Sequence, residues 1–168
     1  GPQCDQCNAE LPGGAVARAN SDEAGHFRLD NVPAGTDIPM IIQIGKWRRK
    51  ELLPMVAACT DNALPAAQTS LPKNRGEGDL PRIAIASASC DALECLVRRM
   101  GVSDFEFTSD TGSGAVHIYN AGGFDHIGST SLSAATTLWG SEDKLKNYDI
   151  VMNSCECSQN AGAKTQAM

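Results

Sequence analysis

Cysteine is the residue type with the most evident chemistry in this chain of 168 residues. Its seven cysteines are Cys4, Cys7, Cys59, Cys90, Cys95, Cys155 and Cys157. A spread of this kind is typical of an exported protein that is stabilised by several disulfides, so all seven are disulfide candidates. Because seven is odd, at least one thiol stays free, pairs with another chain, or has its partner in sequence beyond this chain.

The cysteine pairs near the two ends of the chain allow a second interpretation, a soft-metal site. Cys4 and Cys7 have the C-x-x-C spacing of half a zinc site, and Cys155 and Cys157 could supply two further thiolates for zinc or copper. A thioredoxin-like redox role would need the first pair at a helix N-terminus, and the turn-rich sequence around it predicts no helix. A structural disulfide is therefore the favoured interpretation, with metal binding as an alternative.

Cys155 is the best candidate for a nucleophile by position. It follows a predicted parallel strand, and open α/β sheets bind their ligands at the carboxyl ends of such strands. A thiolate nucleophile also needs a base, for which His117 and His126 are candidates. The alternative is a disulfide with Cys90 or Cys95, and this alternative is favoured.

The first part of the chain has the pattern of short antiparallel strands. Short stretches with a strand pattern at residues 15–19, 26–29, 38–44 and 47–53 are separated by turn sequences rich in Gly, Asp and Pro. Such spacing predicts a partial antiparallel β-sandwich over residues 14–56. Residues 47–50 (WRRK) could contact a protein or polysaccharide surface, although basic residues on an edge strand also serve to block edge-to-edge pairing.

The pattern changes to α/β after a Pro-rich linker at residues 57–81. Residues 83–86 read as a strand buried on both faces, and a helix follows, with Asp91 and Glu94 in the spacing of a capping box and Gly101 as its C-cap. A second strand is predicted at 116–119, a helical stretch at 132–148 and a third strand at 149–153. This order predicts a partial parallel α/β sheet over residues 82–154, similar to a flavodoxin or amidotransferase layer.

A sheet of three parallel strands would leave residues 149–153 as an exposed apolar edge. We therefore expect the chain to be a fragment of a longer protein, or this edge to be covered by self-association or by another segment. The remaining divisions are a cysteine-containing segment at residues 1–13 and a polar tail at 155–168.

Two stretches resemble known families. Residues 22–44, with the core D-x-x-G-H-F-R-L-D-N-V-P-A-G, resemble the carboxypeptidase regulatory-like (transthyretin-like) β-sandwich domain. Residues 38–54 and 71–108 are similar to large secreted or lipid-anchored proteins of myxobacteria, in which such a domain precedes a class I glutamine amidotransferase-like α/β domain. The resemblance covers roughly residues 4–157 and implies an exported location, without implying an established activity. In the amidotransferase-like fold the nucleophile follows a later strand, which this chain lacks.

Composition excludes several functions. The net charge of −6 and the pI near 5.0 disfavour a nucleic-acid groove. No apolar run is long enough to span a membrane. We expect a disulfide-stabilised extracellular or cell-surface structural or binding module, with no cofactor and no catalysis by this chain alone. An amidotransferase-like hydrolase completed by sequence outside this chain is the first alternative, and soft-metal binding is the second.

Overall fold

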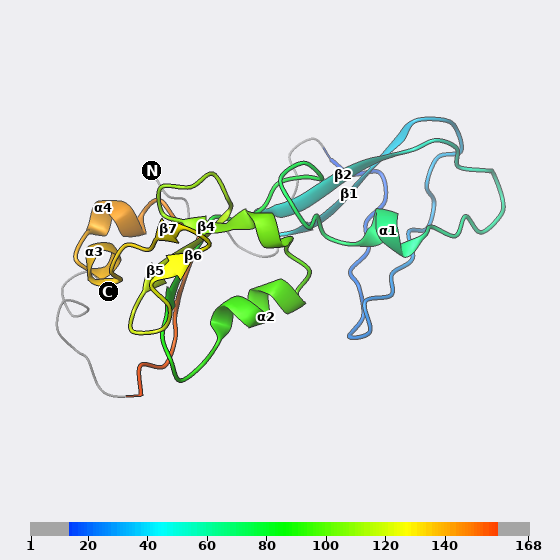
Figure 1. Ribbon diagram of the computed structural model, residues 1–168. Coiled ribbons are helices and arrows are strands. Elements are labelled where there is room, and N and C mark those ends of the chain that lie inside the picture. Colours follow the sequence, from blue (N-terminus) through cyan, green and yellow to red (C-terminus); the bar gives the residue numbers. More distant parts are fainter. Residues whose placement is uncertain (1–13, 158–168) are drawn as a thin grey trace. The chain divides into compact units, whose positions relative to one another are not determined.

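The computed structural model describes residues 14–157 (Figure 1). The chain divides between Leu71 and Pro72 into two compact units, which we call the N-terminal unit and the C-terminal unit. The fold is of mixed α and β content, with antiparallel strand pairs and a four-stranded parallel sheet.

The N-terminal unit is built on one β-hairpin. Strand β1 (Ile38–Ile44) pairs antiparallel with β2 (Trp47–Leu53), and Ile44 lies opposite Trp47 across a two-residue turn. Gly45 takes a φ of 55°, the left-handed conformation that tight hairpin turns require. One face of the hairpin buries Met40 and Leu53 against other apolar side chains.

The expected sandwich is not confirmed. Residues 15–19 and 26–29 form no strand, so the described part of this unit contains one two-stranded sheet, with a single isolated bridge between Gly35 and Val56. The segment before the hairpin is organised by a side chain instead, because Asp22 Oδ1 accepts the backbone N–H groups of Ala24 and His26 at 2.9 and 2.8 Å. Residues 57–81, predicted as a linker, contain the short helix α1 (Ala66–Thr69).

The basic stretch on β2 does not form a continuous exposed surface. Trp47 and Arg49 are buried, whereas Arg48 and Lys50 are exposed, as the alternation of a strand requires. The guanidinium of Arg49 donates to Glu51 Oε1 at 3.0 Å and to the Ala67 carbonyl at 3.2 Å. Half of this stretch therefore belongs to the packing of the unit.

The C-terminal unit is a parallel sheet in the order β4-β5-β3-β8. Its bounds are β3 Ile83–Ser87, β4 Phe107–Ser109, β5 Val116–Asn120 and β8 Ile150–Asn153. All five residues of β3 are buried, which confirms the prediction of a strand covered on both faces. Helix α2 (Leu93–Arg99) contacts β3, while α3 (Thr136–Trp139) packs with Ala84, Ala86 and Tyr119 on the opposite face.

Strand β4 and the 3-10 turn before it (Asp104–Glu106) were not predicted from the sequence. A strand of three residues is too short to show a periodicity, and it returns to the parallel β5 through a very short connection. Gly114 makes that return feasible, because a Cβ at this position would overlap the backbone carbonyl of Glu106.

Helix α2 differs at its start from the sequence prediction. The N-cap residue is Ala92, no side chain caps the helix, and the carboxylate of Asp91 accepts the backbone N–H of Cys155 instead. The predicted capping box with Glu94 is therefore wrong, since Asp91 is used in a tertiary contact. Gly101, with φ of 103°, ends the helix as predicted.

The connection from β5 to β8 carries the remaining elements. A small hairpin of β6 (His126–Ile127) and β7 (Thr130–Ser131) was not predicted. The helical stretch predicted over residues 132–148 is confirmed only in part, as the short helices α3 and α4 (Glu142–Leu145), between which Gly140 lies.

Candidate functional site

The carboxyl edge of the parallel sheet brings together three loops of the C-terminal unit. Ser87 lies opposite Asn120 and Ala86 lies opposite Asn153, so the loops that follow β3, β5 and β8 leave the sheet side by side. The connection from β3 leads to β4 at one edge of the sheet, and the connection from β5 leads to β8 at the other edge. A parallel sheet binds ligands at such a switch point, where neighbouring loops diverge.

The loops after β3 and β5 are hydrogen-bonded to each other. The Ser87 carbonyl accepts the N–H groups of Ala121 and Gly123 at 2.8 and 3.2 Å, and the Ser89 hydroxyl donates to the Gly122 carbonyl at 3.2 Å. A Cβ at Gly123 would lie 2.8 Å from Ser87 Oγ and 3.0 Å from the Ser87 carbonyl oxygen. The close approach of the two loops therefore requires glycine at this position.

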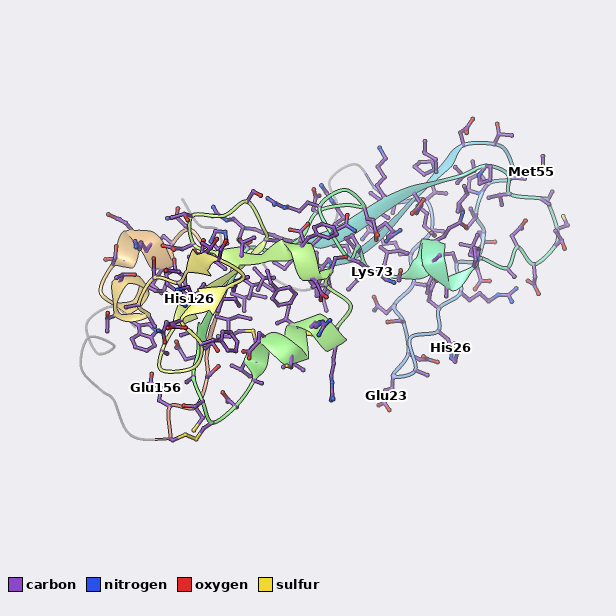
Figure 2. All side chains as sticks on the ribbon, viewed as in Figure 1. Glu23, His26, Met55, Lys73, His126 and Glu156 are labelled. Atoms are coloured by element: carbon purple, nitrogen blue, oxygen red, sulfur yellow. A yellow bond between two sulfur atoms is a disulfide. The ribbon has the colours of Figure 1, made fainter. Side chains whose placement is uncertain are left out.

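The loop after β8 is fixed to the loop after β3 by a disulfide. Cys90 is bonded to Cys157 with a Cα–Cα distance of 5.5 Å, and the bond lies near Glu156 in Figure 2. Two backbone contacts hold the same loops together, because the Cys90 N–H donates to the Cys155 carbonyl at 3.2 Å and the Cys155 N–H donates to Asp91 Oδ1 at 2.7 Å.

A cavity of about 470 Å³ opens at this edge. Its charged lining groups are the carboxylates of Asp91 and Glu94, and its largest apolar side chain is Phe124, which is 43% exposed. The complete lining is Ala88, Ser89, Cys90, Asp91, Ala92, Glu94, Gly123 and Phe124. Two carboxylates beside an aromatic ring favour neutral or cationic small molecules over anionic ones.

Two buried hydroxyl groups lie at the same end of the sheet. Ser87 is completely buried and Ser154 is 5% exposed, and neither Oγ has a hydrogen-bond partner within the described part of the chain. Buried polar groups without a partner are uncommon in folded proteins. The edge therefore has hydrogen-bonding capacity that residues 14–157 do not use.

The two candidate bases do not serve Cys155. His117 lies in β5, is 3% exposed, and its Nδ1 is 2.7 Å from the Tyr148 hydroxyl. His126 lies in β6, where its ring nitrogens contact Asp125 Oδ1 at 2.8 Å and Ser131 Oγ at 3.1 Å. The structure thus places Cys155 at the carboxyl edge, as the sequence predicts, without bringing either imidazole to it.

A buried polar chain occupies the face of the sheet covered by α3 and α4. The Tyr148 hydroxyl lies 2.7 Å from His117 Nδ1 and 2.8 Å from the Tyr119 hydroxyl. Burial lowers the pKa of His117, and the nearby Arg82 cation acts in the same direction. Burial likewise raises the pKa values of both tyrosines. The side chains of His117, Tyr119 and Tyr148 are therefore uncharged at physiological pH, and this hydrogen-bonded group has a structural role.

The cysteine pairing differs from the sequence prediction. Cys155 was expected to bond with Cys90 or Cys95, but Cys90 is bonded to Cys157, and Cys155 is exposed and free, as are Cys59 and Cys95. The left-handed conformation of Cys157, with φ of 62°, turns the chain back toward Cys90. Nothing in the sequence signals this turn, because Cys157 is not a glycine.

The soft-metal alternative concerns residues that the structure describes only in part. Cys4 and Cys7 lie outside the described residues, and Cys157 is bonded to Cys90 and so offers no thiolate. Over residues 14–157 no group of three or more His, Cys, Asp or Glu side chains could hold a metal ion.

Comparison with known protein families, curated proteins and solved structures finds no match to this chain. No helix within the described residues is long and apolar enough to cross a membrane. The residues of the site that sequence reasoning missed are Gly122, Gly123 and Phe124. Their signal was the Gly-Gly pair two residues after a predicted strand, near the position where parallel sheets bind ligands.

Proposed function

We propose that this chain is a disulfide-stabilised binding or structural module of an extracellular or cell-surface protein. The observation that carries the proposal is the bond between Cys90 and Cys157, which joins two loops at the carboxyl edge of a parallel sheet, where such sheets bind ligands. Disulfides persist in oxidising compartments and are rare in the cytosol, which supports an exported location. The adjacent cavity supports a binding role rather than a purely structural one.

The resemblance of residues 22–44 to carboxypeptidase regulatory-like domains supports the same role. Such sandwiches act as rigid spacers or docking surfaces, and the hairpin of β1 and β2 would be part of one. We propose that residues other than those the structure describes complete this sandwich. The resemblance of the second unit to an amidotransferase-like layer is likewise a proposal.

The outer edge of β8 is a second element of the proposed role. Among the described strands β8 pairs only with β3, and its sequence IVMN contains no charge and no proline, the residues that normally protect an exposed edge. We propose that a second copy of the chain pairs with this edge. Two antiparallel β8 strands would bury Ile150, which is 44% exposed in the single chain.

An amidotransferase-like hydrolase is the less supported alternative. It would need a base within hydrogen-bond distance of a nucleophile, and both His117 and His126 have other partners. Such an activity would depend on residues outside this chain.

The stabilising role of the disulfide is tested by Cys90→Ser. Cys90 and Cys157 are 67 residues apart, and closing a loop of this length stabilises a fold by about 4 kcal/mol in the chain-entropy model. We expect the free energy of unfolding of the C-terminal unit to fall by roughly this amount in urea. Cys59→Ser, which removes an exposed free thiol, is the matched control and should change nothing. Equal stability of both variants would contradict the proposal.

Pairing through β8 is tested by sedimentation equilibrium at micromolar concentration. Ile150→Lys places a charge at the edge and should convert a dimer to a monomer. Leu52→Lys, at an apolar site on β2 that is more exposed than Ile150, should leave the dimer intact. A monomeric unsubstituted chain, or loss of the dimer in both variants, would contradict pairing through β8.

A further inference from the structure

Three cysteines meet at the carboxyl edge, although only two of them are bonded. The free Cys155 is exposed, and its carbonyl accepts the N–H of Cys90 at 3.2 Å. Its own N–H donates to the side chain of Asp91 at 2.7 Å. These contacts are made by the backbone of Cys155, so they hold it beside Cys90 whichever sulfur atoms are bonded.

Cys90 therefore has two cysteines at bonding distance. A backbone N–H···O=C hydrogen bond holds the Cα atoms of the two residues that it joins roughly 4.5–6.5 Å apart. Disulfides form at Cα separations of about 4.4 to 6.8 Å. The hydrogen bond to Cys90 keeps Cys155 within this range, in which Cys157 also lies, with its Cα 5.5 Å from that of Cys90.

The two pairings close loops of nearly the same length. They close loops that differ by two residues, so their loop-closure entropies are nearly equal. The observed bond holds Cys157 at a φ of 62°, a conformation that is unfavourable for a residue with a Cβ. Bonding of Cys90 to Cys155 would remove the need for this conformation.

We propose that Cys90, Cys155 and Cys157 form a thiol–disulfide exchange site. The Cys155 thiolate attacks Sγ of Cys90, the Cys90–Cys155 bond forms as the Cys90–Cys157 bond breaks, and the electron pair leaves on Sγ of Cys157, which takes up a proton. One disulfide and one thiol are present before and after the step, so no oxidant or reductant is consumed. This inference rests on the disulfide of the proposed exported module.

The exchange would act as a switch at the proposed binding edge. In one state Cys157 is bonded to the loop after β3, and in the other Cys155 is bonded to that loop and Cys157 is released from it. Cys90 also lines the cavity, so the exchange changes which cysteine is bonded to Cys90 at the cavity wall. A direct bond between Cys155 and Cys157 would close a small strained ring, which makes Cys90 the sulfur that is attacked.

Peptide mapping without reduction tests the proposal, because Glu156 separates the two competing cysteines. The full chain is incubated at pH 8.5 under argon, quenched with acid, alkylated and cleaved after glutamate. We expect a Cys90–Cys155 linkage in an amount within about tenfold of the Cys90–Cys157 linkage. It should form faster at higher pH, because the thiolate is the nucleophile, and at a rate independent of protein concentration.

Two variants separate the outcomes. Cys155→Ser should keep Cys90–Cys157 as the linkage of Cys90, and Cys95→Ser should exchange at the unsubstituted rate. Absence of the Cys90–Cys155 linkage after prolonged incubation, with Cys90–Cys157 intact, would overturn the exchange site and leave the proposed module in place. Absence of any bond to Cys90 would contradict both.

Discussion

The hydroxyl of Tyr148 is the central atom of the buried chain on the α3 and α4 face, so Tyr148→Phe is an incisive perturbation. Nδ1 of His117 lies 2.7 Å from this hydroxyl and the Tyr119 hydroxyl lies 2.8 Å from it. The backbone at Gly112 and Gly114 raises the pKa of His117, as acceptors of a ring N–H do, so we assign the ring proton to Nε2 and the acceptor role to Nδ1. Tyr148 therefore donates to His117 and accepts from Tyr119.

The direction of these bonds sets the magnitude. Tyr148→Phe leaves both the acceptor of His117 and the donor of Tyr119 buried without a partner. Each such group costs about 1–3 kcal/mol, so for the two groups we expect a loss of about 2–6 kcal/mol. Tyr119→Phe removes only a donor, and the Tyr148 hydroxyl still donates to His117. Its expected cost is about 1 kcal/mol.

Urea unfolding of the C-terminal unit measures both costs. Trp139 is 5% exposed in this unit and reports its unfolding by fluorescence, provided that Trp47 of the N-terminal unit is replaced by Phe in every variant. The expected order of stability is unsubstituted, then Tyr119→Phe, then Tyr148→Phe. Equal losses for the two variants, or a loss below about 0.5 kcal/mol for Tyr148→Phe, would refute the assigned directions.

Three further predictions concern the same unit. Burial lowers the pKa of His117, so the unfolded chain binds a proton on this imidazole at higher pH than the folded chain does. The free energy of unfolding should therefore fall as the pH drops below about 6.5. A free energy of unfolding that stays constant down to about pH 5 would contradict the burial of His117. Gly123→Ala should destabilise the unit by about 1–3 kcal/mol in the same assay, because its Cβ would lie 2.8 Å from Ser87 Oγ, and an unchanged urea midpoint would contradict the close approach. Glu106→Gln should lower the free energy of unfolding by about 2 kcal/mol. The buried carboxylate of Glu106 accepts three N–H groups, two of them from Arg75, and an amide would replace one of its acceptor oxygens by a donor. A loss below half of that value would contradict this role of the carboxylate.

The elements that the sequence predicts well are those whose pattern is local. The continuous apolar run of β3, the turn between β1 and β2, and the glycine that ends α2 each depend on a few adjacent residues. The apolar stretch of β8 and the helical stretch around Gly140 could likewise be predicted from adjacent residues.

The errors arose where distant contacts decide the structure. Asp91 has the spacing of a helix cap, but its carboxylate accepts the backbone N–H of Cys155, in the loop after β8. The choice of Cys157 over Cys155 as the partner of Cys90 depends on a left-handed turn at a non-glycine residue. Strand β4 depends on a tight return at Gly114. None of these features leaves a periodic trace in the sequence.

The most direct test of the central claim is the disulfide map of the chain purified from its native source. The protein is alkylated in acid before any handling at neutral pH, then cleaved after glutamate without reduction. The account predicts a peptide pair joined through Cys90, with Cys59 and Cys95 alkylated. Alkylated Cys90, Cys155 and Cys157 in the same preparation would contradict a disulfide-closed binding edge.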